Sequence, residues 1–106
     1  MVSNTIAFNI QEILEQIYIS KSRAELFDIL NILHEICMFH KFDLYNYILE
    51  SINIKQVNSP TLIIGLCRVP FLYKNELNSY IDFVDKAQIE LAERGIDSKK
   101  TIQGVL

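Results

Sequence analysis

Residues 59–70 read SPTLIIGLCRVP, and this stretch decides the fold class. Its body, TLIIGLCRV, is apolar on nearly every side, so we expect it to be buried. Taken alone, such a run is equally typical of a buried strand. Ser59 and Pro60 favour a helix, because serine caps a first turn and proline suits the first helical position. Pro70 predicts where this helix ends.

Two capping boxes precede this stretch. Asn9 with Glu12, and Ser22 with Glu25, each place a glutamate three residues after a capping side chain, so that the two can bond each other's backbone. The first box opens an amphipathic helix with isoleucine and leucine on one face and glutamine and glutamate on the other. The second opens a helix that we expect to run to about residue 39 or 40.

Further helices are predicted on either side of the 59–70 stretch. Asp43 is a suitable N-cap for a helix over residues 44 to about 54. Residues 75–94 place apolar side chains on one face and charged side chains on the other, which indicates a long amphipathic helix. Gly95 fits the position just after its end. Asp97 is a suitable cap for a last short helix.

The helical neighbours settle the ambiguity of the central stretch. The chain has 106 residues, of which 50% are hydrophobic, enough for a core without metals or disulfides. Three glycines and two prolines leave few positions for the sharp turns of an all-β fold. We therefore predict an all-α fold, with a single compact domain over residues 1–106. It should be a helical bundle of five or six helices with a largely buried second helix.

The charge pattern argues against nucleic-acid binding. The formal net charge is −3, and the longest basic run is the pair Lys99 and Lys100. Phosphate binding needs several basic side chains on one face, which this pattern does not supply. Residues 1–50 carry seven acids and three bases. This acidic half suits a basic protein partner, although an ordinary solvated surface explains it equally well.

The sequence predicts a cytoplasmic protein with no membrane contact. The start, MVSNTIAFNIQE, lacks the basic and apolar regions of a signal peptide. The longest apolar run, LIIGLC, is far shorter than the roughly 18 residues that a membrane span needs. Two cysteines without an export signal are expected to be reduced thiols.

Residues 34–43, HEICMFHKFD, bring both histidines close to a cysteine. The zinc-protease motif H-E-x-x-H fails, because Met38 stands at the second histidine position. His34 and His40 are six residues apart, which is about 9 Å along a helix, too far to share one ion readily. A helical projection places Cys37 in the middle of the core, as a small buried hydrophobe. A metal or reactive-thiol site at Cys37 is therefore only our third hypothesis.

The second helix also carries a second apolar stripe, formed by Ile29, Ile32, Ile36 and Phe39. In a monomer of five or six helices, a central helix can be covered on several sides, which explains the stripe structurally. The alternative is an apolar surface that binds a partner or a second copy of the chain.

These features favour a non-catalytic protein-binding module, such as an immunity protein, an antitoxin or another inhibitor that occludes a basic surface of a partner enzyme. We predict no catalytic residue, no metal site and no cofactor. The candidate acidic contacts are Glu12, Glu15, Asp28 and Glu35 on the first two helices and Asp82, Asp85, Glu90 and Glu93 on the fifth. The alternative is a self-assembling structural or scaffold protein that forms a homodimer through Ile32, Ile36 and Phe39.

Overall fold

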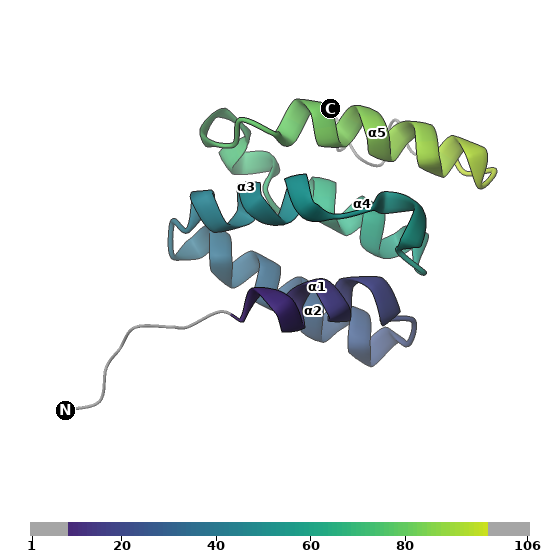
Figure 1. Ribbon diagram of the computed structural model, residues 1–106, viewed down its shortest axis with the longest axis horizontal. Helices are drawn as coiled ribbons and strands as arrows, with labels where there is room; N and C mark the ends of the chain where they lie inside the picture. Colours follow the sequence, from purple (N-terminus) through teal and green to yellow (C-terminus); the bar gives the residue numbers. More distant parts are fainter. Residues whose placement is uncertain (1–8, 98–106) are drawn as a thin grey trace.

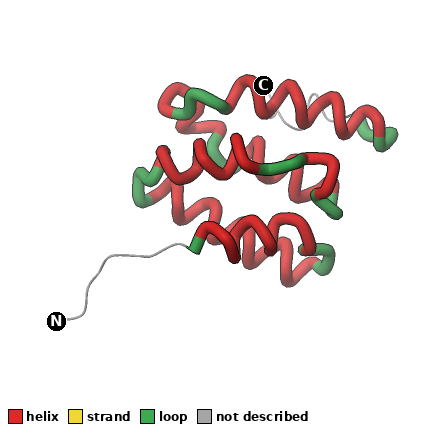
Figure 2. Tube along the Cα trace, viewed as in Figure 1, coloured by secondary structure: helices red, strands yellow, loops and turns green. Residues whose placement is uncertain are grey.

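The predicted helical segments are helical in the computed structural model, which describes residues 9–97 (Figure 2). Five α-helices and two 3₁₀ helices account for most of these residues, and no strand occurs among them. In chain order they are α1 (Ile10–Ile19), α2 (Arg23–Met38), α3 (Phe42–Ser51), η1 (Ile54–Gln56), α4 (Pro60–Arg68), η2 (Phe71–Glu76) and α5 (Tyr80–Glu93). The predicted all-α domain is confirmed. The helix predicted after Asp97 lies outside the described residues.

The α-helices are stacked in three layers (Figure 1). α1 and α2 form the lower layer in this view, α3 and α4 the middle layer, and α5 the upper layer. α2 packs against α1, α3 and α4, while α5 packs against α3, α4 and η1. α4 therefore has a neighbouring layer on each side, which is why its sequence needs apolar residues around most of its circumference.

The core confirms the expected burial of the 59–70 stretch. Four residues of α4 are fully buried, namely Leu62, Ile63, Leu66 and Cys67. α2 contributes four more, namely Ile29, Leu33, Ile36 and Cys37. These residues of α2 lie on one face, and most of the remaining residues of the helix are exposed. The predicted cover around most of the second helix is therefore not found.

Gly65 allows α4 to lie close to α2. A Cβ atom at this position would collide with Cδ2 of Leu30, which projects from α2. The absence of a side chain at Gly65 thus gives Leu30 the space that it occupies between the two helices.

The C-terminal end of α4 is satisfied by tyrosines from two other helices. In a continuing helix, the carbonyl of Leu66 would accept a hydrogen bond from residue 70, but Pro70 has no N–H group. The hydroxyl of Tyr45 on α3 donates to this carbonyl at 3.2 Å. The hydroxyl of Tyr80, the first residue of α5, donates to the carbonyl of Cys67 at 2.8 Å. Both tyrosines are buried, so water cannot reach these carbonyls. The two hydroxyls supply the hydrogen bonds that the carbonyls would otherwise lack.

Several predicted helix ends are confirmed. Asn9 caps α1 through the N–H of Glu12, and Ser22 and Glu25 form the full capping box at the start of α2. α5 ends at Glu93, and Gly95 shortly after it has a positive φ of 82° that lets the chain reverse, so that the N–H of Ile96 donates to the Leu91 carbonyl at 2.8 Å.

The predicted start of the third helix was wrong. The N–H of Tyr45 donates to the carbonyl of Lys41 at 3.0 Å, so α3 begins at Phe42 and Lys41 is its N-cap. Asp43 therefore lies in the first turn rather than at the cap, where its negative charge still suits the positive end of the helix dipole.

The fifth helix also starts later than predicted, at Tyr80 instead of residue 75. Residues 71–76 form the separate helix η2, and Leu77 is extended and buried. Side chains of α3 hold the chain at this break. The N–H of Ser79 donates to Oδ1 of Asn46 at 3.0 Å, and its hydroxyl donates to Glu50.

We predict that Tyr45→Phe and Tyr80→Phe each lower the free energy of unfolding by about 1–3 kcal/mol, because each leaves a buried carbonyl without a donor. Tyr47→Phe is the matched control. Tyr47 belongs to α3, but its side chain is exposed. Removing its hydroxyl should therefore lower the free energy of unfolding by less than about 0.5 kcal/mol. Urea denaturation followed by circular dichroism measures all three. Equal stability of the three variants would contradict this role of the buried hydroxyls.

Candidate partner-binding surface

The HEICMFHKFD stretch forms the end of α2 and the turn into α3. His40 takes a positive φ of 56°, and its N–H and that of Lys41 donate to carbonyls of the last turn of α2. The His40 ring packs edge-on against Phe42, at 5.4 Å between ring centroids. His34 and His40 are both exposed. The stretch thus terminates a helix, and the described residues 9–97 contain no group of three or more His, Cys, Asp or Glu side chains placed to hold a metal ion.

The two thiols lie in the core. Cys37 and Cys67 are fully buried, as the helical projection predicts for Cys37, and neither forms a disulfide. Burial raises the pKa of Cys37 to about 11 and that of Cys67 to about 12, because the charged thiolate loses its hydration. Both groups are therefore protonated thiols at neutral pH, a form that is a poor nucleophile and a poor metal ligand.

Two of the four acidic residues proposed on α5 are engaged within the chain. Asp82 pairs with Lys86 at 3.1 Å, and Glu90 pairs with Nε of Arg94 at 2.9 Å. The Arg94 guanidinium also reaches the carbonyls of Ile54 and Lys55, at 3.3 and 3.4 Å. Glu90 is half-buried, so it orients Arg94 to hold α5 against η1. Glu90 thus has a role within the chain, and its role as a partner contact stays a prediction.

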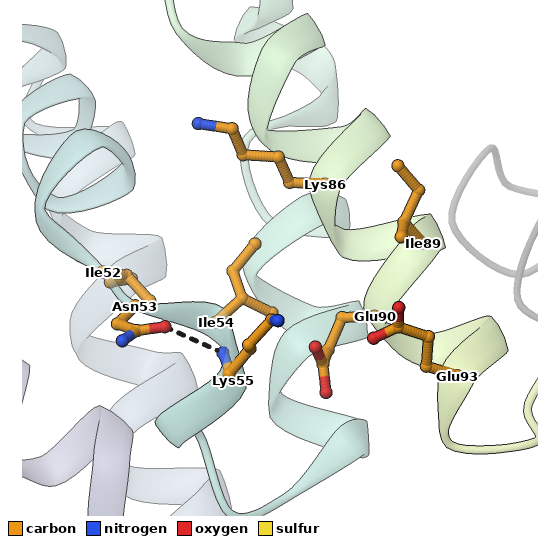
Figure 3. Close-up of a pocket in the computed structure, with 8 residues that line it drawn as sticks. All are labelled: Ile52, Asn53, Ile54, Lys55, Lys86, Ile89, Glu90 and Glu93. Carbon is orange, nitrogen blue, oxygen red and sulfur yellow. Dashed lines mark hydrogen bonds between the residues drawn. The ribbon is translucent and has the colours of Figure 1, made fainter.

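A groove of about 440 Å³ lies between α5 and the segment from Ile52 to Lys55 (Figure 3). Isoleucines from both sides line it, together with Lys55, Lys86, Glu90 and Glu93. Two lysines and two glutamates give this groove no net charge. Asp85 and Glu93 are exposed, but Glu93 shares the groove with these lysines. The α5 side is therefore a poor match for a strongly basic partner.

The acids of α1 and α2 differ from those of α5. Glu12, Glu15, Asp28 and Glu35 are all exposed. None of these four carboxylates forms an ion pair with a basic side chain of residues 9–97, unlike Asp82 and Glu90. Their charge is available to a partner, in contrast to that of Asp82 and Glu90.

The proposed apolar stripe of α2 is divided by the fold. Ile36 is fully buried, so its assignment as a surface contact is corrected to a core position. Ile32 is half-buried and packs against the core, while Phe39 remains 50% exposed. The contact predicted for the homodimer thus retains only Ile32 and Phe39 at the surface.

The structure adds two exposed side chains that the sequence reasoning missed. Phe27 is 65% exposed and Met38 is 58% exposed, although both are large and apolar. They are eleven residues apart, which is close to three helical turns, so they project from the same side of α2. This spacing is visible in the sequence, but only the packing of α1, α3 and α4 shows that this side is uncovered. We call the exposed set Phe27, Asp28, Glu35, Met38 and Phe39 the α2 outer face.

We predict that a thiol reagent labels Cys37 and Cys67 at least about 100-fold more slowly in the folded chain than in urea, because both thiols are buried and protonated. Met38→Cys provides the control, since it places a thiol next to Cys37 at an exposed position. It should be labelled rapidly while the protein is folded. Rapid labelling of the unmodified protein would instead support the third hypothesis, a reactive thiol.

The Arg94 contact gives a second prediction. Arg94→Ala should lower the free energy of unfolding by about 1–3 kcal/mol, because it removes partly buried, charge-assisted hydrogen bonds to Glu90 and η1. Lys86→Ala breaks an ion pair of the same spacing in the same helix. That pair is about 70% exposed, so its loss should cost less than about 0.5 kcal/mol. Chemical denaturation measures both, and a larger effect at Lys86 would contradict the internal role of Arg94.

Comparison with protein-family models, with curated proteins and with solved structures finds no match to this chain. No helix among residues 9–97 is long and apolar enough to cross a membrane. What the protein does is therefore inferred from its own surface, where unpaired carboxylates and uncovered apolar side chains meet on α2.

Proposed function

We propose that this chain is a non-catalytic protein-binding module of the immunity or antitoxin type, which acts in the cytoplasm by occluding a basic surface of a partner enzyme. The observation that carries this proposal is the set of four exposed carboxylates on α1 and α2 that lack an ion pair within the described residues. Exposed charge of one sign speeds association with an oppositely charged protein and selects against partners of the same sign.

The chemistry of the core is in keeping with a binding role. The two thiols are buried and protonated, His34 on α2 and His40 just after it are exposed, and no group of three or more His, Cys, Asp or Glu side chains among the described residues is placed to hold a metal ion. A protein that acts by occlusion needs a rigid surface instead of a reactive group. The buried hydrogen bonds of Tyr45 and Tyr80 join α3, α4 and α5, and α2 packs against two of these helices.

Self-assembly is the second candidate, and the exposed aromatic and methionine side chains of α2 favour it. A second copy would bury Phe27, Met38 and Phe39, with Ile32 at the edge. Light scattering over a range of concentrations distinguishes the two functions, because an inhibitor of another protein is expected to remain monomeric.

The proposed function predicts a strong dependence of binding on salt. A partner recovered from the source cells with the immobilised chain should lose affinity at least about tenfold when salt is raised from about 0.05 M to about 0.5 M. Neutralising Glu12, Glu15, Asp28 and Glu35 as amides should weaken binding and flatten this dependence. The matched control, Asp82→Asn with Asp85→Asn, should leave both nearly unchanged. An affinity independent of salt would contradict occlusion of a basic surface.

A further inference from the structure

The α2 outer face has an order that a simple acidic patch lacks. Phe27 and Met38 lie on one side of the face, about 16 Å apart along the helix, with the exposed polar residues Asn31 and His34 between them. Phe39 and the half-buried Ile32, seven residues apart, lie on the other side. At about 100° per residue, Asp28 and Glu35 project between these two sides. The face therefore presents two carboxylates with apolar side chains on each side of them.

No helix of the described chain covers this face. α1, α3 and α4 pack on the side of α2 that carries Ile29, Leu33, Ile36 and Cys37. Phe27, Met38 and Phe39 are each at least half exposed. Aromatic residues and methionine are enriched in the parts of a surface that become buried in complexes. Three such side chains along one helix are a suitable apolar contact for a partner.

A second copy of the chain is a poor occupant because of charge. A two-fold contact places the same surface on both subunits, so the acids of one face would meet the acids of the other. The α2 outer face itself carries no lysine or arginine, and the exposed basic residues Arg23 and Lys41 lie only at its two ends. A two-fold contact would therefore bring four carboxylates together at its centre, which opposes association. An anionic lipid surface is repelled by the same carboxylates.

We propose that the α2 outer face binds a partner segment that carries a row of lysine or arginine bordered by apolar side chains, the complement of its own pattern. This inference deepens the proposed function and rests on it, because it assigns the contact to α2 and defines the chemistry of the partner. Lysine or arginine of the partner pairs with Asp28 and Glu35, and its apolar side chains pack on Phe27, Met38 and Phe39. Burial of these apolar contacts around the charged pairs excludes water and strengthens them.

The test uses a synthetic amphipathic peptide of about 18 residues with leucine rows bordering a row of lysine, and a matched peptide with glutamate in place of lysine. Fluorescence anisotropy measures binding of each peptide to the full chain. The lysine peptide should bind at least about tenfold more tightly than the glutamate peptide. Asp28→Lys with Glu35→Lys should reverse this preference. These exposed positions are not expected to affect folding, which circular dichroism verifies.

A second pair of variants distinguishes specific apolar contacts on this face from nonspecific hydrophobic binding. Phe27→Gln with Met38→Gln should weaken binding of the lysine peptide at least about tenfold, because it removes the two most exposed apolar side chains of the face. Ile81→Gln with Ile89→Gln is the matched control, since it removes two exposed apolar residues from α5. It should change affinity less than about twofold. Equal effects of the two pairs, or equal binding of the two peptides, would overturn the assignment to α2.

Two other outcomes also overturn it. Concentration-dependent dimerisation that Phe27→Gln with Met38→Gln abolishes would show that a second copy occupies the face. Binding to vesicles of phosphatidylserine and phosphatidylcholine that the same pair abolishes would show a lipid surface instead. If the lysine peptide does not bind as expected while a recovered protein partner still binds with the expected salt dependence, the proposed function stands. Only the assignment of the contact to the α2 outer face is then wrong. If the peptides bind as expected but partner affinity is independent of salt, the proposed function fails.

Discussion

The hydroxyl groups of Tyr45 and Tyr80 join α3, α4 and α5 at the buried end of α4. α4 packs against both neighbouring layers, so its last carbonyls cannot form hydrogen bonds with water. Pro70 also lacks the N–H that would donate to the Leu66 carbonyl in a continuing helix. One tyrosine comes from α3 and the other from α5. Their bonds place both helices relative to α4, and with them the surfaces that each helix presents to solvent. Burial raises the pKa of both phenols, that of Tyr80 to about 12, so both remain donors at neutral pH.

The fold gives the acidic residues two different roles. On α5, Glu90 is half-buried and orients Arg94 toward the backbone of η1, while Asp82 pairs with Lys86. On α1 and α2 the corresponding acids are exposed, and no basic side chain among the described residues pairs with them. Formal charge alone does not separate these groups. The acids of α5 differ because Glu90 is partly buried and because Arg94 and Lys86 lie beside Glu90 and Asp82.

α2 combines structure and surface in a single helix. Its inner face fits against three helices, with Gly65 of α4 leaving space for Leu30. Its outer face carries two carboxylates flanked by exposed apolar side chains, and no helix of residues 9–97 covers it. The HEICMFHKFD stretch shows this division within a few residues. Ile36 and Cys37 enter the core, Met38 and Phe39 are exposed, and His40 turns the chain toward α3.

The sequence by itself determined the helices, because capping boxes, helical periodicity and Gly95 act over a few residues. It also placed Cys37 and the 59–70 stretch in the core. It misplaced the starts of α3 and α5, since Lys41 is the N-cap of α3 directly after the His40 turn and side chains of α3 hold Ser79 before α5. Only the tertiary structure decided that Ile36 is buried while Phe27 and Met38 are exposed, because all three fit an apolar pattern around α2. Which side of a helix is covered depends on neighbours distant in the chain, and no local pattern encodes their position.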